Sequence, residues 1–360
     1  MNGPNRILIT ADIHCGIPGK THDVLWALRT MSNYAQQENI THIIVLGDLF
    51  HDRVSINIEV LNAVYDFFEH TPKSQQWICL PGNHDTFLRN SWEINSIRPL
   101  GKLLKAIDSK TSFLYNKQRF WVLPFIHNED KYMMELKQIK AKKDDILLTH
   151  IGVNGAILNS CFLMQYWNVV TFQQTVFKRI FTGHFHCHQD LNNVHYPGSP
   201  ISFRFDDGME PHGFLTYDIA DDVVQFHGIY ETAQLLNEPG NPPPRHITLT
   251  DADLNKAIEF KGDEIRISLE KEYSTNELRD IKHRLMEHGI KAVKWIYPKK
   301  QEGAKQKADN VVIDLKNPDN FFQTWIKHDQ PTGFNIKLLS KLNRQIYNEA
   351  MDRLVTDGEE

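Results

Sequence analysis

The sequence has 360 residues, 41% of them hydrophobic and 24% charged, an ordinary balance for a soluble globular protein with room for two domains. No apolar run approaches the ~18 residues that span a bilayer, and no apolar signal segment follows the start, so we expect a cytoplasmic protein without a membrane partner. A formal net charge of −5 disfavours a free-standing module that holds DNA mainly by its own basic surface.

The first part of the chain alternates predicted strands with predicted helices. The strands are Arg6–Thr10, Thr41–Leu46 and Trp77–Pro81. Between them, apolar residues recur at the helical period from about Asp23 to Gln37 and from about Ser55 to Glu69. Because parallel strands need crossover connections, this alternation predicts a sheet with helices packed against it.

The next part of the chain consists mainly of predicted strands. These strands are Ser112–Tyr115, Arg119–Leu123, Asp145–Thr149, Arg179–Thr182, Ile201–Phe205 and Gly213–Tyr217, and a charged helix is predicted over Glu129–Lys143. The first two strands are separated by a short polar turn and form a predicted hairpin. We therefore predict an α/β fold of two packed sheets flanked by helices.

The segment Asn237–Arg245 contains four prolines and one glycine in nine residues, which predicts a stiff, extended linker. We divide the chain into a first domain of residues 1–235, a linker of residues 236–246, a small α+β domain of residues 247–330 and a C-terminal amphipathic helix in residues 331–360. In the small domain, strands Glu264–Glu270 and Ile290–Tyr297 enclose a helix opened by a capping box of Ser274 and Glu277. The last helix could pack on its own domain or dock on a partner.

Polar side chains follow five of the predicted strands, at the point where each strand ends. They are Asp12 and His14, then Asp48, then Asn83 to Asp85, then His150, and finally His184 and His186. Any one of these motifs alone has a structural explanation. Because the ends of neighbouring strands meet at one edge of a sheet, the whole series predicts a single metal centre.

The types of these side chains indicate which metals the centre would hold. A binuclear phosphoesterase holds two cations roughly 3.5–4 Å apart that share a carboxylate. Carboxylate, amide and imidazole ligands together suit Mn, Fe or Zn, and the lack of thiolate ligands disfavours a structural zinc. Asp48 follows Gly47, whose missing side chain allows close backbone approach, and is the natural bridging ligand.

Next to Asn83, His84 is not needed as a metal ligand. Its imidazole could protonate the leaving oxygen or stabilise charge on a phosphate. Asp85 could orient that histidine.

The same residues resemble the signature of the calcineurin-type metallophosphoesterases. The corresponding blocks are Asp12-x-His14, Gly47-Asp48, Gly82–Asp85, His150 and Gly183–His186. Within that group, four segments are similar to the SbcD family, the nuclease subunits of bacterial, phage and MRN-type break-repair complexes. They are Gly47–His51, Tyr196–Pro200, Phe203–Asp206 and Gly213–Phe214. The small domain after the linker resembles the capping domain of that family.

The resemblance implies an α/β two-sheet metallophosphoesterase sandwich that binds two Mn²⁺ ions, with Mg²⁺, Fe or Zn as other possibilities. One ion would be held by Asp12, His14, Asp48 and His186. The other ion would be held by Asp48, Asn83, His150 and His184. His84 would be the catalytic histidine, and His51 would contact the scissile phosphate or position the DNA.

The resemblance also implies a function and partners. The chain would be a Mn²⁺-dependent DNA nuclease subunit, a 3′-to-5′ exonuclease and endonuclease that acts in double-strand-break repair and recombination. It would form a homodimer and assemble with an SbcC-type coiled-coil ATPase, in a bacterial cytoplasm or, for a phage protein, in that of the host. Two alternatives stay open: a phosphodiesterase acting on small nucleotide substrates, and an inactive scaffold that retains the fold.

Overall fold

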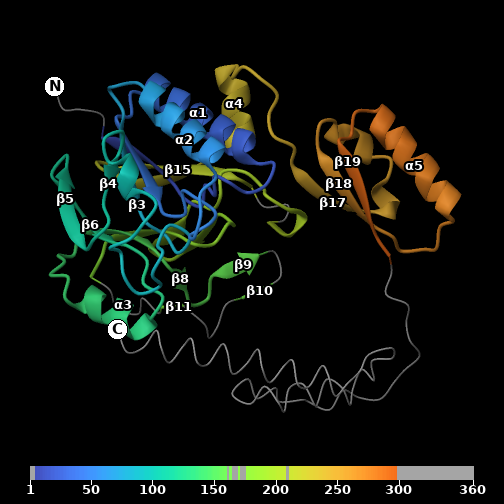
Figure 1. Cartoon of the computed structure of the whole chain (residues 1–360). Coiled ribbons are helices and arrows are strands. Elements are labelled where there is room, and N and C mark those ends of the chain that lie inside the picture. The colour runs from blue at the N-terminus through green and yellow to red at the C-terminus, as the bar shows by residue number, and fades with distance from the viewer. Residues whose placement is uncertain (1–4, 160–161, 164–168, 171–175, 208–210, 298–360) are drawn as a thin grey trace, which may run out of the picture. The chain divides into compact units, whose positions relative to one another are not determined.

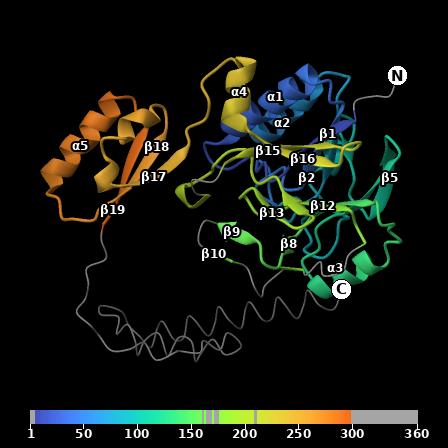
Figure 2. The same cartoon turned by 180° about the vertical axis from the view of Figure 1, so that it is seen from behind.

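The computed structural model describes residues 5–159, 162–163, 169–170, 176–207 and 211–297 (Figures 1 and 2). In this part of the chain, no helix is both long and apolar enough to cross a bilayer. The predictions for residues 298–330 and for the helix in residues 331–360 lie outside the described residues. The division of the chain at the proline-rich segment stays a prediction.

The first sheet has six strands in the order β16-β15-β1-β2-β3-β4. Their bounds are β1 (Arg6–Thr10), β2 (His42–Leu46), β3 (Gln76–Leu80), β4 (Lys105–Ala106), β15 (Gly213–Asp218) and β16 (Val223–Gly228). Strands β1 to β4 are parallel, and β15 pairs antiparallel with β1. The last four residues of β1, β2 and β3 are buried, as expected for a sheet that is covered on both faces.

Helices α1 (Thr21–Gln37), α2 (Ile58–His70) and α4 (Ile229–Leu236) cover one face of this sheet (Figure 1). The predicted second helix starts three residues too early, because Asn57 is the N-cap and its side chain accepts a hydrogen bond from the Glu59 amide. Phe68 is buried, whereas Phe67 is only partly covered.

The second sheet also has six strands, in the order β13-β14-β12-β7-β6-β5. Their bounds are β5 (Thr111–Tyr115), β6 (Gln118–Leu123), β7 (Ile146–His150), β12 (Arg179–Gly183), β13 (Gln189–Leu191) and β14 (Val194–Tyr196). The predicted hairpin is confirmed: β5 pairs antiparallel with β6. Its turn residues Asn116 and Lys117 both have positive φ, as a type I′ hairpin turn requires.

The inner faces of the two sheets share one apolar core, which confirms the predicted two-sheet sandwich. The core includes Ile7, Ile9, Ile44, Leu46 and Ile78 of the first sheet, and Phe120, Val122, Ile146, Leu148 and Phe181 of the second. Alternate residues such as Leu8 and Val45 point to the helices instead. Because one core joins the two sheets, the carboxyl ends of their strands are held in fixed positions relative to one another.

Helix α3 (Glu129–Lys137) packs on the outer face of the second sheet through Tyr132 and Leu136. It ends six residues before the predicted Lys143. The Asp145 carboxylate accepts hydrogen bonds from the Lys142 amide and the Trp121 indole, so the chain has turned towards β7 by this point.

The predicted strand Ile201–Phe205 is wrong, because this segment leads into the 3₁₀ turn η2 (Phe205–Asp207). Oδ2 of Asp207 accepts hydrogen bonds from the amides of Phe203 and Arg204, which bends the backbone away from an extended conformation. The remaining short elements here are η1 (Arg98–Leu100), β8 (Gly152–Val153), β9 (Ile157–Asn159), β10 (Phe162–Leu163) and β11 (Val169–Val170).

After the proline-rich segment, three parallel strands form a separate sheet in the order β17-β18-β19. The elements are β17 (His246–Thr250), η3 (Asp251–Asp253), η4 (Ala257–Phe260), β18 (Glu264–Ser268), α5 (Thr275–Glu287) and β19 (Ala292–Ile296). The helix and its capping box of Ser274 and Glu277 are confirmed, and the two predicted strands form but are shorter than the predicted Glu264–Glu270 and Ile290–Tyr297. Strand β17 was not predicted from the sequence.

Candidate metal centre

The polar residues that follow the strands converge at the carboxyl edge of both sheets. Asp12, His14, Asp48 and Asn83 follow β1, β2 and β3 of the first sheet, whereas His150, His184 and His186 end or follow β7 and β12 of the second. Asp12, His14, Asp48 and His150 are almost completely buried, and the other three are partly exposed. The structure thus brings together side chains that are far apart in the sequence.

Two groups of side chains each place their ligand atoms within 4.8 Å of one another: Asp12 with His14 and His186, and Asp12 with Asp48 and His150. Oδ2 of Asp48 lies 3.7 Å from Nε2 of His14 and 3.4 Å from Nε2 of His150, so this one atom faces both groups. That position is the one expected of a bridging carboxylate.

Asn83 joins the second group through its side-chain oxygen. Oδ1 of Asn83 lies 2.9 Å from Nε2 of His150 and 2.7 Å from Nδ1 of His184. In the first group, Nε2 of His14 and Nε2 of His186 face each other at 3.1 Å. All seven predicted ligands therefore lie in one cluster.

The backbone at this edge adopts an unusual conformation. Four of the seven residues have positive φ: Asp12 (53°), His14 (53°), Asp48 (54°) and His184 (103°). Side chains other than glycine rarely adopt this region, and such residues concentrate at functional sites. Hydrogen bonds between the loops after β1 and β2 stabilise this backbone conformation. The Asp12 amide donates to the Gly47 carbonyl, and the His14 amide donates to the Asp48 carbonyl.

Two glycines allow the close approach of His150 and Asp48. A Cβ atom at Gly47, which also has φ +86°, would lie 2.5 Å from Nδ1 of His150. A Cβ atom at Gly82 would lie 2.2 Å from Oδ1 of Asp48. Both distances are impossible for real side chains, so these positions require glycine if the cluster is to keep its geometry.

Burial keeps two of the imidazoles neutral. It lowers the pKa of His184 to about 3 and lowers the pKa of His14 well below its usual range. At neutral pH both rings therefore offer a lone pair, which is the form that binds a metal.

The centre of the cluster favours positive charge. Burial opposes protonation of His150, but Asp48, Asp12 and the Leu46 carbonyl raise its pKa to about 9. Burial likewise opposes ionisation of Asp48, yet His150, His14 and His84 hold its pKa well below the usual range. Burial raises the pKa of Asp12 to about 6.

These contacts fit divalent cations. Nδ1 of His150 donates to the Leu46 carbonyl at 2.7 Å, so Nε2 is the nitrogen that faces Asn83 Oδ1 and Asp48 Oδ2. At this nitrogen a metal cation would replace the proton that His150 carries at neutral pH in the metal-free protein. The mixture of carboxylate, amide and imidazole donors suits divalent metals and does not identify which one.

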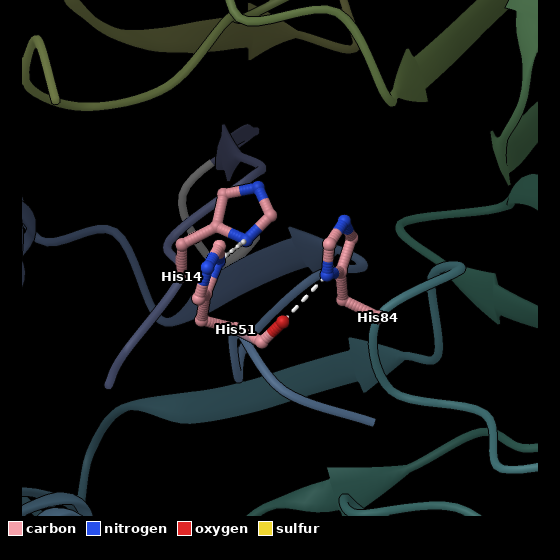
Figure 3. Close-up of side chains that lie close together, drawn as sticks. All are labelled: His14, His51 and His84. Atoms are coloured by element: carbon pink, nitrogen blue, oxygen red, sulfur yellow. Dashed lines mark hydrogen bonds between the residues drawn. The ribbon is translucent and has the colours of Figure 1, made fainter. Parts of the chain in front are cut away.

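His84 and His51 lie beside His14 (Figure 3), and the ligand atoms of these three histidines are within 4.8 Å of one another. The His84 amide donates to Oδ1 of Asp48 at 2.8 Å, and its Nδ1 donates to the His51 carbonyl at 2.5 Å. The two rings are stacked, with 13° between their planes, and Nδ1 of His51 lies 3.4 Å from Nδ1 of His14. Both imidazoles are thus held beside the predicted metal ligands.

The idea that Asp85 orients His84 needs correction. The buried Asp85 carboxylate accepts hydrogen bonds from the amides of Leu49, Phe50 and Gly82 and from the Ser96 hydroxyl. It therefore ties the loop after β2 to the loop after β3, and the backbone carbonyl of His51 orients the His84 ring.

Sequence reasoning missed two groups that support the histidines. One is the Leu46 carbonyl, which a sequence motif cannot reveal because any residue offers one. The other is Asp207, whose Oδ1 lies 3.5 Å from Nδ1 of His186. Burial raises the pKa of this carboxyl, but His186 and the turn amides together lower it to about 2. Asp207 lies well after His186 in the sequence, and nothing in the spacing of the two residues predicts their contact.

Comparisons with known proteins agree with this geometry. Residues 5–188 match the family described as calcineurin-like phosphoesterase, and this span contains all seven predicted ligands. The "Exonuclease subunit 1" of Enterobacteria phage T4 is 23% identical over 229 residues, covering 61% of this chain and 67% of the phage protein. An uncharacterised protein of Acanthamoeba polyphaga mimivirus is 22% identical over 267 residues, covering 67% of this chain but only 19% of that longer protein.

A solved structure, that of a glutamine-dependent NAD+ synthetase from Acinetobacter baumannii, also aligns with the chain. It covers 96% of this chain and 72% of the synthetase, at 9% identity and a TM-score of 0.31. That similarity is too low to indicate a shared fold.

Proposed function

The chain belongs to the calcineurin-like phosphoesterase family, and from this premise we propose that it is a Mn²⁺-dependent DNA nuclease subunit. It would hydrolyse phosphodiester bonds as a 3′-to-5′ exonuclease and as an endonuclease, in a complex that repairs and recombines broken DNA. The observation that carries the proposal is the convergence of seven ligand-type side chains from two sheets, with His84 beside them.

In this proposal two sets of residues hold the cations. Asp12, His14, Asp48 and His186 form one set, and Asp48, Asn83, His150 and His184 form the other. Divalent cations bound there would supply a nucleophile from water at neutral pH and neutralise charge on the phosphate. The protein contributes neutral imidazoles, fixed ring orientations and a buried carboxylate between the two sets.

His84 is proposed to act on the leaving group. Because its Nδ1 donates to the His51 carbonyl, its Nε2 is the nitrogen left for the substrate. A proton at Nε2 would be donated to the leaving oxygen or would stabilise charge on the phosphate, steps that typically contribute 10²–10⁴-fold. His51, stacked on His84, is proposed to contact the scissile phosphate or position the DNA.

DNA is favoured over small nucleotides by two observations. The similar phage protein is named as an exonuclease subunit. In addition, the sheet of β17 to β19 with α5 forms a second structured part, which a small substrate does not require. Because the net charge of the chain is −5, we propose that a partner supplies part of the affinity for DNA, and that this partner is an SbcC-type coiled-coil ATPase.

A homodimer is part of the proposal, and one face of α2 supports it. Ile58 and Tyr65 lie seven positions apart, on the same side of the helix, and their exposed fractions are 73% and 42%. Nearby Val54 is exposed by 73%. Apolar side chains gathered on one exposed face indicate an interface. Light scattering should give the mass of a dimer for the wild type and of a monomer for Ile58→Glu.

The test is cleavage of labelled duplex DNA with Mn²⁺, with and without the ATPase. Wild-type protein should cleave the DNA, and Asn83→Ala should not. The substitution removes the side-chain oxygen that faces both His150 and His184, and with it one proposed ligand of the second ion. Faster turnover of cyclic nucleotides than of DNA would favour the small-substrate phosphodiesterase. Absence of metal-dependent cleavage under both conditions would overturn the proposal.

A further inference from the structure

The segment Phe203–Asp207 contacts the metal centre on one side. Oδ1 of Asp207 lies 3.5 Å from Nδ1 of His186. The Phe203 ring packs edge-on against the rings of His14 and His186, with centroids 5.7 Å and 5.6 Å away. The segment is thus in direct contact with two of the predicted ligands.

Asp207 is held firmly in this position. Its carboxylate is buried, and Oδ2 accepts hydrogen bonds from the amides of Phe203 at 2.7 Å and Arg204 at 3.1 Å. The other oxygen, Oδ1, faces His186 and also lies 3.6 Å from Nε of the largely exposed Arg204. A carboxylate at Nδ1 keeps the proton on that nitrogen, so that Nε2 of His186 presents its lone pair towards Nε2 of His14.

The other side of the segment contacts the three-stranded sheet. Oδ1 of Asp206 accepts a hydrogen bond from Nη1 of Arg266 at 3.0 Å, and the Phe205 carbonyl accepts one from Nη2 of the same side chain at 3.4 Å. The guanidinium of Arg266 and the ammonium of Lys294 lie 5.2 Å and 4.9 Å from the centre of the Phe205 ring.

Arg266 and Lys294 act together because they are neighbours in register on β18 and β19. The ring of His246, on β17, packs edge-on against the same Phe205 ring at 5.0 Å. Each of the three strands of the small sheet therefore contributes one side chain that contacts the ring of Phe205, two residues before Asp207. Cation–π contacts of this kind contribute measurably even at partly exposed sites.

We propose that Asp207 is a positioning residue that orients His186 for metal binding, and that Arg266 and Lys294 hold Asp207 in place through Phe205 and Asp206. The small sheet thereby sets the affinity of one of the two cations from outside the centre. The inference rests on the proposed two-metal centre. Adjacent acidic residues that face opposite ways, Asp206 to Arg266 and Asp207 to His186, form the connection.

The first experiment is calorimetric titration of Mn²⁺ into metal-free protein. In Asp207→Asn, the affinity for one ion should fall by about 10- to 100-fold, the usual effect of removing a carboxylate behind a histidine ligand, while the other ion binds as in wild type. Asp207→Glu should restore most of the lost affinity. Visible absorption of the Co²⁺-loaded protein should change for one of the two sites only.

The second experiment separates the path through the small sheet from a general loss of stability. Arg266→Gln should weaken the same ion by a smaller factor, and it should add little in the Asp207→Asn background, because both act on one turn. Arg6→Gln, which removes a comparable ion pair with Glu38 at 2.8 Å, should leave binding unchanged. The melting temperature of each metal-free variant is measured alongside.

The outcomes are distinguishable. Failure of wild-type protein to bind two Mn²⁺ ions overturns the metal centre and this inference together. Two ions bound with wild-type affinity by Asp207→Asn overturn the inference alone. Equal weakening of both ions with a lowered melting temperature also overturns it, since Asp207 would then be structural only.

Discussion

Oδ2 of Asp48 lies 3.4 Å from Nε2 of His150, although Asp48 follows a strand of the first sheet and His150 ends a strand of the second. The same carboxylate atom is 3.7 Å from His14. Because one atom faces both groups of predicted ligands, Asp48 is the residue on which the proposed chemistry most depends.

Replacing Asp48 by asparagine should remove both bound cations or leave one weakly held. The amide keeps the size of the side chain but not the charge, so DNA cleavage should fall by at least about 100-fold. Metal content after dialysis against Mn²⁺, measured by mass spectrometry, checks the cause. Asp52→Asn is the matched control, because that exposed side chain accepts hydrogen bonds from Val54 and Ser55 and is not one of the predicted ligands. Full metal content in Asp48→Asn would contradict the bridging role.

Replacing His84 by glutamine should separate catalysis from metal binding. Since His84 lies beside the ligands without belonging to them, Mn²⁺ content should stay as in wild type while the cleavage rate falls by roughly 10²–10⁴-fold. His70→Gln, at the exposed end of α2, should change neither quantity. If metal content falls in parallel with the rate, His84 is a ligand and the assignment is wrong.

The stability that protonated His150 gives the metal-free protein should disappear as the pH rises from 6.5 to 9. His150 has its pKa raised from 6.5 to about 9, so its protonation stabilises the fold fully below 6.5, and this contribution disappears as the pH rises through 9. Burial opposes protonation of His186, but Asp207 raises its pKa, which adds to the same trend. Asp12 and Asp85, with pKa values raised to about 6 mainly by burial, titrate below this window.

Thermal melting of chelator-treated protein at several pH values measures this effect. Burial lowers the pKa values of other histidines, among them His14 and His184, and these groups add stability as the pH rises through 6.5. The informative quantity is therefore the difference in melting temperature between wild type and His150→Gln, which should shrink as the pH rises to 9. A difference that stays constant from pH 6.5 to 9 would contradict the assigned charge on His150.

Replacing Gly82 by alanine should damage the centre through a single methyl group. The added Cβ would lie 2.2 Å from Oδ1 and 2.6 Å from the amide nitrogen of Asp48, so the loop must shift, at a cost of about 1–3 kcal/mol or more. At Gly240 the same methyl meets nothing within 4 Å, and its positive φ costs only about 1 kcal/mol.

Urea denaturation of these two variants gives the free energies of unfolding, and Mn²⁺ titration gives the affinities. Gly82→Ala should weaken metal binding, whereas Gly240→Ala should not. Equal affinities would show that the close approach at Gly82 is not needed.

Much of the sandwich could be predicted because its strands are short apolar runs buried on both faces, and β1 matches its prediction residue for residue. Errors fell where side chains override local pattern. The Lys142 amide donates to Asp145 within the segment expected to be helical, and the Phe203 amide donates to Asp207 within the expected strand Ile201–Phe205. A sequence pattern does not show such bonds, because they depend on which loops meet in space.

The same limit applies to the candidate site. The ligand-type residues could be predicted because they stand at strand ends, where the backbone emerges from the sheet. The orientation of Asp85 could not, since its four donors come from three separate segments. The role of Asp207 depends on the distance to His186, which only the folded chain defines.

The origin of the ligands in two different sheets has a mechanical consequence. Cations bound by Asp48 and Asn83 of the first sheet and by His150 and His184 of the second would cross-link the two sheets. Ligand binding to the native state alone raises its stability by mass action. Metal occupancy should therefore slow amide hydrogen exchange throughout the shared core, at strands well beyond the loops that touch the ions.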